Sequence, residues 1–145
     1  MLEIKENKIC FVFDVDGTLT EHRKKISSSF SREFTSWAKD KQCYISTGSD
    51  YRKTVEQIGK TVNIFKNVFC CMSNEIRDPQ GQKIYKSNFS TPANLEIALE
   101  CFLENSKYDC KTGNHLEFRT GMLNFSIVGR NATQEERKEY TKWDN

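Results

Sequence analysis

The chain has 145 residues, of which 37% are hydrophobic and 12% aromatic, and this apolar content excludes a disordered protein. Its net charge is +2 with basic and acidic residues interspersed, so a polyanion-binding tail is excluded and nucleic acid is not expected as a partner. The stretch MLEIKENKICFVF holds no apolar run long enough for a signal peptide or a membrane span, so we expect a cytoplasmic protein without membrane attachment.

The first half of the chain alternates short apolar runs with helical patterns. We predict strands at 8–13, 43–46 and 67–71, with helices at 27–39 and 50–58 between them. Strands that alternate with helices predict a parallel α/β sheet, in which ligands bind at the carboxyl ends of the strands. Because DVDGT and STGSD follow the first two strands, we expect these two loops to converge in space.

The second half of the chain has a different pattern. DPQGQK (78–83) predicts a hairpin turn, 92–105 predicts a helix, and the runs 115–118 and 122–128 predict an antiparallel hairpin. Thr133 and Glu136 form a capping-box pattern that begins a last helix. We therefore divide the chain into a core module at 1–81 and a second, α+β module at 82–145.

Asp14 and Asp16 stand two positions apart where the first strand ends, so both carboxylates face the same side. Two acids this close repel each other, and a hard cation such as Mg²⁺ relieves the repulsion while it gathers phosphate oxygens. With the cation bound, one carboxylate can act as a nucleophile while the other transfers protons. The structural alternative is a pair of loop acids that only caps a turn, which the full string FDVDGTLT after an apolar strand disfavours.

The DVDGT string resembles DxDGT, the first motif of the haloacid dehalogenase superfamily of phosphotransferases. The resemblance implies a Rossmannoid core with a parallel sheet, and a second motif in which a Ser or Thr after a strand binds the phosphoryl group. Thr47 fits that motif, with Ser49 as the other hydroxyl of the loop. Thr47 alone would be an ordinary turn hydroxyl, but its place after the second strand favours the phosphoryl-binding role.

A more specific resemblance lies at 113–137, where GNHLEFRTGMLNFSIVGRNATQEER closely resembles the cap of eukaryotic-type phosphomannomutases. That family implies interconversion of mannose 6-phosphate and mannose 1-phosphate through an aspartyl-phosphate, on the cytoplasmic route to GDP-mannose and protein N-glycosylation. It also implies Mg²⁺, a hexose 1,6-bisphosphate activator and a homodimer formed through the cap. Asp14 would be the nucleophile and Asp16 the general acid/base, both on the metal, and Arg23 would contact substrate.

The cap string carries three arginines that match the family's substrate-binding arginines, namely Arg119, Arg130 and Arg137. A mutase must hold the distal phosphate of its hexose phosphate while the other end reacts, and bidentate guanidinium groups suit this task better than lysines. A single arginine would ordinarily be a solvated charge on the surface, and the position of all three inside the family's string favours the substrate-binding role. Asn124 matches the Asn of the family's GMLN, with substrate contact and hairpin support both open.

The chain departs from the family in its length and in its first two loops. A third-motif Lys and a fourth-motif acidic cluster would follow the cap, and 138–145 contain neither, so we expect the N-terminal portion of the enzyme with an incomplete cap. Glu21 and His22 replace a Pro and an Ala of the family, and STGSD replaces its GGSD. Two alternatives stay open: a sugar-phosphate phosphatase of the same superfamily, and a non-catalytic fragment that binds substrate or dimerises.

Overall fold

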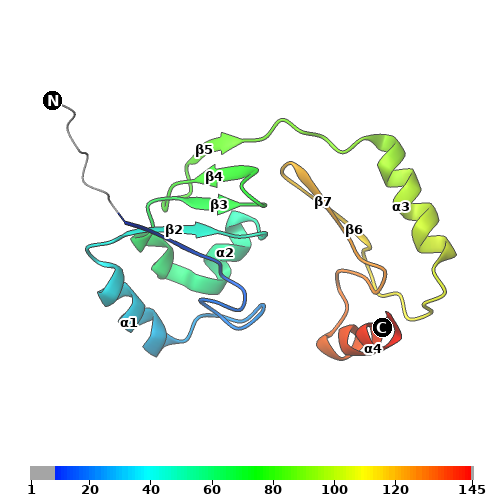
Figure 1. Ribbon diagram of the computed structural model, residues 1–145, viewed down its shortest axis with the longest axis horizontal. Helices are drawn as coiled ribbons and strands as arrows, with labels where there is room; N and C mark the ends of the chain where they lie inside the picture. Colours follow the sequence, from blue (N-terminus) through cyan, green and yellow to red (C-terminus); the bar gives the residue numbers. More distant parts are fainter. Residues whose placement is uncertain (1–8, 145) are drawn as a thin grey trace. The chain divides into compact units, whose positions relative to one another are not determined.

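The computed structural model describes residues 9–144, and the chain forms two compact units, Met1–Ser87 and Asn88–Asn145 (Figure 1). Lys8, the predicted start of the first strand, lies outside the described residues. Between residues 9 and 144, no helix has the length and apolar character needed to cross a membrane.

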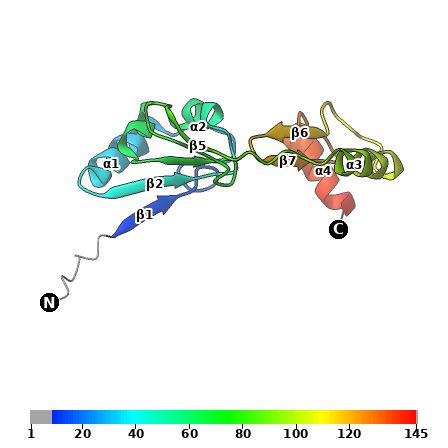
Figure 2. The same cartoon turned by 90° about the horizontal axis from the view of Figure 1, so that it is seen from above.

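The first unit is a five-stranded sheet that carries its helices on one face (Figure 2). Its elements in chain order are β1 (Cys10–Phe13), α1 (Ser28–Ala38), β2 (Gln42–Ser46), α2 (Tyr51–Ile58), the 3₁₀ helix η1 (Gly59–Ile64), β3 (Val68–Cys70), β4 (Glu75–Arg77) and β5 (Lys83–Lys86). The strands lie in the order β1-β2-β3-β4-β5; the first three are parallel, and β4 and β5 are antiparallel to their neighbours. The predicted parallel sheet and the hairpin around 78–83 are therefore confirmed.

The strand β5 belongs to the predicted second module but pairs with β4 in the sheet of the first unit. Contacts thus divide the chain after Ser87, whereas the sequence places the start of the second module at 82. The division by function, into a catalytic core and a cap, stays a prediction.

Both helices of the first unit begin at side chains that cap them. Ser27 accepts a hydrogen bond from the Phe30 N–H at 3.3 Å, and Asp50 accepts one from the Lys53 N–H at 2.8 Å. Each cap satisfies a backbone donor that has no partner within its own helix. The helix starts predicted at these two residues are confirmed.

The core of the first unit lies between the helices and one sheet face. The parallel register places Phe13 beside Ile45 and Ile45 beside Val68, and the last two are fully buried. Phe34 of α1 packs against Phe13 and Phe65, with ring centroids 5.0 and 5.8 Å apart. This aromatic cluster fixes α1 against the strand from which the DVDGT loop continues.

The second unit contains α3 (Ala93–Asn105), β6 (Leu116–Arg119), β7 (Met122–Phe125) and α4 (Gln134–Asp144). The strands β6 and β7 form an antiparallel pair, which confirms the predicted hairpin and the α+β character. Strand alternation puts Glu117, Arg119 and Asn124 on one face of the pair. On the opposite face, Phe125 contacts Phe102 of α3, with ring centroids 6.1 Å apart.

The helix α4 begins with the predicted capping box. The Thr133 N–H donates to Glu136 Oε2 at 2.6 Å, and the Glu136 N–H donates to Thr133 Oγ1 at 3.2 Å. A small core of Tyr108, Val128 and Ala132 lies beneath this helix start. The cap and this cluster together fix the start of α4 in the second unit.

Gly129 permits the close approach of two loops in the second unit. Its φ is +95°, and a Cβ added there would lie 1.8 Å from the Thr112 carbonyl oxygen. Any other residue would clash with that backbone, so the glycine of VGR is required by packing.

Candidate active site

The first loop begins where β1 ends and is held in a tight turn by its own backbone. The carbonyl of the buried Val15 accepts hydrogen bonds from the N–H groups of Leu19 and Thr20, both at 3.0 Å. Gly17, at φ +82°, donates its N–H to the Thr20 carbonyl at 2.7 Å, a left-handed conformation that suits glycine. Asp14 is exposed, and its Oδ1 accepts the Val15 N–H at 2.7 Å. The loop therefore presents the Asp14 carboxylate to solvent from an ordered backbone.

Asp16 lies deeper in the same loop and is surrounded by hydrogen-bond donors. Its Oδ1 accepts the Arg23 backbone N–H at 2.6 Å and Gln57 Nε2 at 2.8 Å. Partial burial raises the pKa of the Asp16 carboxyl, but these hydrogen bonds and the charges of Lys53 and His22 outweigh it. The net pKa of Asp16 lies below its ordinary value, so Asp16 is ionised at neutral pH and can accept a proton.

Gln57 is a residue of this site that the sequence analysis missed. It is 5% exposed, comes from α2, and places its Nε2 also 3.4 Å from Thr20 Oγ1. Its Oε1 is buried and has no hydrogen-bond partner among residues 9–144. The available signal was helical spacing, because Thr54, Gln57 and Ile58 recur three and four positions apart and so share one face of α2, which the structure buries.

The second loop follows β2 and carries two buried hydroxyl residues. Thr47 and Ser49 are 4% and 5% exposed, and the Ser49 N–H donates to Thr47 Oγ1 at 3.1 Å. Because β1 and β2 are parallel neighbours with Phe13 beside Ile45, the loops that begin at Asp14 and Thr47 leave the same edge of the sheet. The predicted convergence of the two loops is confirmed, and the phosphoryl-binding role of the two hydroxyls stays a prediction.

The turn after β3 is a second feature that the sequence analysis missed. Cys71, Met72 and Ser73 have positive φ angles of +51°, +56° and +67°, a conformation that costs a non-glycine residue about 1–2 kcal/mol. The Cys71 N–H donates to the Ser49 carbonyl at 3.0 Å, and the Met72 N–H donates to the Thr47 carbonyl at 3.1 Å. The strained turn is therefore fastened to the second loop. Its composition hides it, because Gly, Asn and Asp are the usual markers of left-handed turns.

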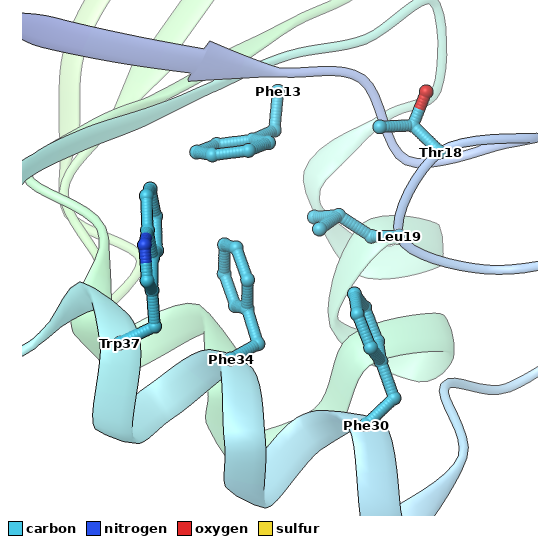
Figure 3. A pocket seen from close by; sticks show the side chains of 6 residues that line it. All are labelled: Phe13, Thr18, Leu19, Phe30, Phe34 and Trp37. Atoms are coloured by element: carbon cyan, nitrogen blue, oxygen red, sulfur yellow. The ribbon is translucent and has the colours of Figure 1, made fainter.

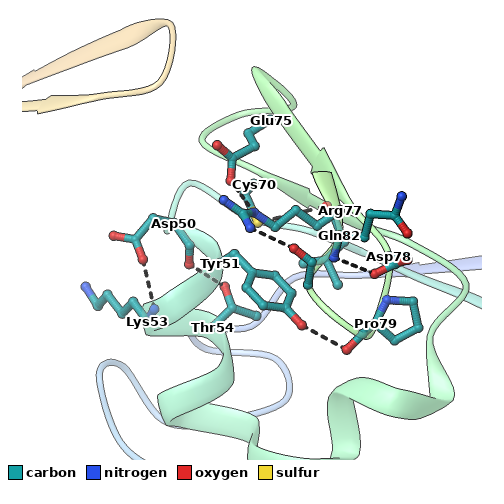
Figure 4. A network of polar contacts seen from close by, with 12 residues as sticks. Asp50, Tyr51, Lys53, Thr54, Cys70, Glu75, Arg77, Asp78, Pro79 and Gln82 are labelled. Atoms are coloured by element: carbon teal, nitrogen blue, oxygen red, sulfur yellow. Dashed lines mark hydrogen bonds and ion pairs between the residues drawn. The ribbon is translucent and has the colours of Figure 1, made fainter. Parts of the chain in front are cut away.

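A polar network fastens the start of α2 to the β4–β5 hairpin (Figure 4). Tyr51 Oη donates to the Pro79 carbonyl at 2.8 Å, and the Arg77 guanidinium lies over the Tyr51 ring, 5.3 Å from its centroid. Arg77 Nε also donates to Glu75 Oε1 at 2.6 Å. Beside this network, burial raises the pKa of the Cys70 thiol to about 12, so Cys70 is a neutral packing group. The network holds in place the helix that bears the glutamine of the site.

An apolar pocket borders the first loop (Figure 3). It has a volume of about 250 Å³ and is lined by Phe13, Thr18, Leu19, Phe30, Phe34 and Trp37. None of these side chains is charged, so the pocket offers no charged partner for a phosphate. It belongs to the packing of α1 against β1.

Asp14 and Asp16 are the acids that the first loop offers to a metal. Carboxylate oxygens suit Mg²⁺, which commonly takes one or two protein carboxylates and completes its shell with water and phosphate oxygens. In the part of the chain that the structure describes, no group of three or more His, Cys, Asp or Glu side chains is placed to hold a metal ion. The two acids therefore fit a largely hydrated Mg²⁺ and not a closed metal site.

In the second unit, Glu117 joins two of the predicted arginines. Its Oε1 accepts Arg119 Nη2 at 3.0 Å, and its Oε2 accepts Arg130 Nε at 2.6 Å. Partial burial raises the pKa of Glu117, but the two guanidinium groups outweigh it and lower the net pKa. Asn124 lies opposite Glu117 across the hairpin, and its buried Nδ2 has no hydrogen-bond partner among the described residues. The structure thus gathers two guanidinium groups and an amide donor on the polar face of the hairpin.

Arg137 contacts the same loop through backbone atoms. Its Nη2 donates to the Gly129 carbonyl at 3.1 Å and to the Arg130 carbonyl at 2.9 Å. Arg137 therefore ties α4 to the segment that bears Arg130. Glu117 was not among the residues predicted from the sequence, although its spacing two residues before Arg119 on β6 was a usable signal. The substrate-binding roles of these residues stay predictions.

The chain is similar to known proteins over most of its length. A family model described as eukaryotic phosphomannomutase matches residues 31–145. A phosphomannomutase of Dendrobium officinale is 34% identical over 139 residues, which cover 92% of this chain and 55% of that protein. A phosphomannomutase of Spinacia oleracea is 34% identical over 143 residues, which cover 94% and 57%. The chain thus spans about half the length of the curated relatives it matches.

Among solved structures, a phosphatase of the haloalkanoate (HAD) superfamily from Bacteroides thetaiotaomicron is similar with a TM-score of 0.50 and 23% identity. The match covers 72% of this chain and 38% of that one. At this identity the likeness concerns the fold alone, and it confirms the predicted haloacid dehalogenase-like α/β core.

Proposed function

This chain belongs to the eukaryotic phosphomannomutase family, and we propose that it carries out the interconversion of mannose 6-phosphate and mannose 1-phosphate through an aspartyl-phosphate. The observation that carries the proposal is the family match over residues 31–145, which includes the second loop and the arginines of the second unit. The DVDGT loop lies before the matched range and adds the two carboxylates that the chemistry needs. Since the chain spans about half the length of its relatives, the activity of the whole protein is part of the proposal.

In the proposed reaction, Asp14 is the nucleophile and Asp16 the acid/base. An Asp14 oxygen attacks one phosphorus of hexose 1,6-bisphosphate, the bond from phosphorus to the sugar oxygen breaks, and the protonated form of Asp16 donates its proton to that oxygen, which leaves a hexose monophosphate. In the return step, a hydroxyl of a hexose monophosphate attacks the phosphorus of the aspartyl-phosphate, the bond from that phosphorus to the Asp14 oxygen breaks, and ionised Asp16 accepts the hydroxyl proton. Asp16 is ionised at neutral pH, which is the form that accepts the proton of the return step, whereas the first step uses the protonated form.

Mg²⁺ is the metal that we propose for Asp14 and Asp16, and when bound it would neutralise charge on the transferring phosphoryl group. Hexose 1,6-bisphosphate is proposed as the activator because it can phosphorylate Asp14 and yield either monophosphate. Thr47 and Ser49 would contact the transferring phosphoryl group. The loop geometry supports this role, because the loop that carries both hydroxyls begins at the same sheet edge as the first loop.

The core, 1–81, is proposed to perform the chemistry, and the cap, 82–145, to select the substrate. Arg119 and Arg130 are held by one carboxylate on one face, which orients their guanidinium groups for bidentate contact with the distal phosphate. The proposed substrate-binding residues are Arg23, Thr47, Ser49, Arg119, Asn124, Arg130 and Arg137.

A homodimer through the cap is proposed, and exposed apolar side chains of α3 support it. Leu95, Ile97 and Phe102 are 43%, 62% and 60% exposed. We place the reaction in the cytoplasm, where mannose 1-phosphate would supply GDP-mannose for protein N-glycosylation, with hexose phosphates as ligands and no nucleic acid or membrane partner.

The test incubates the purified chain with mannose 6-phosphate, Mg²⁺ and hexose 1,6-bisphosphate and follows the products by ³¹P NMR. Mannose 1-phosphate is expected. Asp14→Asn should abolish its formation because the nucleophile is lost, whereas Asp40→Asn, an exposed acid after α1, should not change it. Free phosphate without isomer would indicate a phosphatase, and binding without turnover a non-catalytic fragment; either result would contradict the proposal.

A further inference from the structure

We propose that the left-handed turn Cys71–Ser73, locked by Asn74, is a positioning element that holds the Thr47–Ser49 loop in the shape that binds phosphate. The inference rests on the phosphotransferase function proposed above. It assigns a part in that function to residues that lie outside both sequence motifs.

The first support is the way the turn bonds to the loop. Consecutive N–H groups of Cys71 and Met72 donate to the carbonyls of Ser49 and Thr47, at 3.0 and 3.1 Å. The Thr47 N–H donates to the Phe69 carbonyl at 2.9 Å, so Thr47 is bonded to β3 through its N–H and to the turn after β3 through its carbonyl. In a trans peptide, the C=O and the N–H point in opposite directions. The Gly48 N–H shares its peptide plane with the Thr47 carbonyl and therefore points away from the turn.

The second support is the backbone conformation. Three consecutive non-glycine residues with positive φ are costly, and such a segment persists only where its surroundings enforce it. Asn74 is the enforcing residue, because its N–H and its Nδ2 both donate to the Cys71 carbonyl, at 3.2 and 2.9 Å. The Asn74 carbonyl accepts the Ser87 N–H at 2.7 Å, and Ser87 is the last residue of the first unit. Asn74 thus anchors the turn to the point where the chain leaves this unit.

The third support is the side chain of Met72. It is 68% exposed, and its Sδ lies 3.5 Å from the place that a Cβ on Gly48 would take. A large apolar side chain at this exposure contributes little to the core. Its place beside Gly48 is accounted for if the turn serves the loop.

The experiment uses inorganic phosphate as the probe and ¹H–¹⁵N NMR of the 145-residue chain as the readout. Phosphate should shift the Gly48 and Ser49 amide signals of the wild-type chain. Asn74→Ala removes the side-chain donor to Cys71, so we expect a phosphate dissociation constant about five- to tenfold higher and faster solvent exchange of the Cys71 and Met72 amides.

Met72→Val tests the same inference without removing a hydrogen bond. A β-branched residue disfavours positive φ, so phosphate binding should weaken in the same direction. This variant decides the question if Asn74→Ala fails to fold. Asn63→Ala, an exposed asparagine of η1, is the matched control and should change neither quantity.

The outcomes separate this inference from the proposed function. Faster amide exchange with unchanged phosphate affinity would show that the turn is only structural and would overturn the inference while the proposed function stands. Equal weakening in Asn63→Ala would overturn it as well. A wild-type chain that shows no phosphate shift at Gly48 or Ser49 would refute the phosphate-binding role of the loop, and with it both proposals.

Discussion

Replacing Glu117 by glutamine should destabilise the second unit by about 2 kcal/mol. The carboxylate accepts Arg119 Nη2 at 3.0 Å, and Arg130 Nε and Nη2 both at 2.6 Å. A hydrogen bond to a charged group contributes about 1.5–3 kcal/mol, but Glu117 is 35% exposed and water screens part of this. Because glutamine keeps one acceptor, we expect a loss near the value of a single strong bond.

The two tryptophans of the chain provide the assay, because each reports on one unit. Trp143 packs against Tyr108 and Tyr140 with ring centroids 5.1 and 5.9 Å apart, whereas Trp37 lies in α1. In a Trp37→Phe background, Trp143 fluorescence follows the unfolding of the second unit in urea. With a urea dependence of about 1–2 kcal/mol/M, Glu117→Gln should lower the midpoint by about 1–2 M.

The pH dependence checks the cause of this loss. Since the pKa of Glu117 is lowered from 4.5 in the folded state, its stabilisation is complete above 4.5 and is lost as pH falls through the lowered value. The gap between wild type and Glu117→Gln should therefore shrink in acid. Glu139→Gln removes an exposed ion pair with Lys142 in the same unit and is the control that should have little effect. Equal midpoints for wild type and Glu117→Gln at neutral pH, or a gap that stays constant down to about pH 3, would refute the reasoning.

Three further predictions concern the first unit. Phe34→Ala removes the ring that packs against Phe13 and Phe65, so the free energy of unfolding should fall by about 3–5 kcal/mol. Urea unfolding followed by Trp37 fluorescence in a Trp143→Phe background measures this change. A loss below about 1 kcal/mol would contradict the packing. Ser73→Gly should raise the free energy of unfolding by about 1 kcal/mol and the unfolding temperature by about 4–8 °C, because glycine accepts the φ of +67° without strain. Calorimetry measures the change, and a lower Tm would show that Ser73 is not strained. Iodoacetamide should label the exposed Cys10, Cys101 and Cys110 well before Cys70, because burial shields the Cys70 thiol and raises its pKa to about 12. Mass spectrometry follows the labelling, and equal labelling rates for Cys70 and the exposed cysteines would disprove the burial of Cys70.

The sequence by itself determined the local elements and the location of the first loop. Asp50 starts α2, and Thr133 with Glu136 starts α4, because a cap involves residues only three positions apart. The convergence of the loops at Asp14 and Thr47 was also predictable, because parallel strands joined by a helix leave their following loops at one sheet edge.

Only the tertiary structure decided which side chains support these loops. Gln57 reaches Asp16 across 41 positions, and Glu117 reaches Arg130 across 13, contacts that depend on how a helix or a hairpin packs. The left-handed turn at Cys71–Ser73 had no marker either, since nothing in those residue types favours positive φ. Local propensity acts within a few residues, whereas these contacts form only after distant segments have packed, because packing alone brings the donors and acceptors within hydrogen-bond distance.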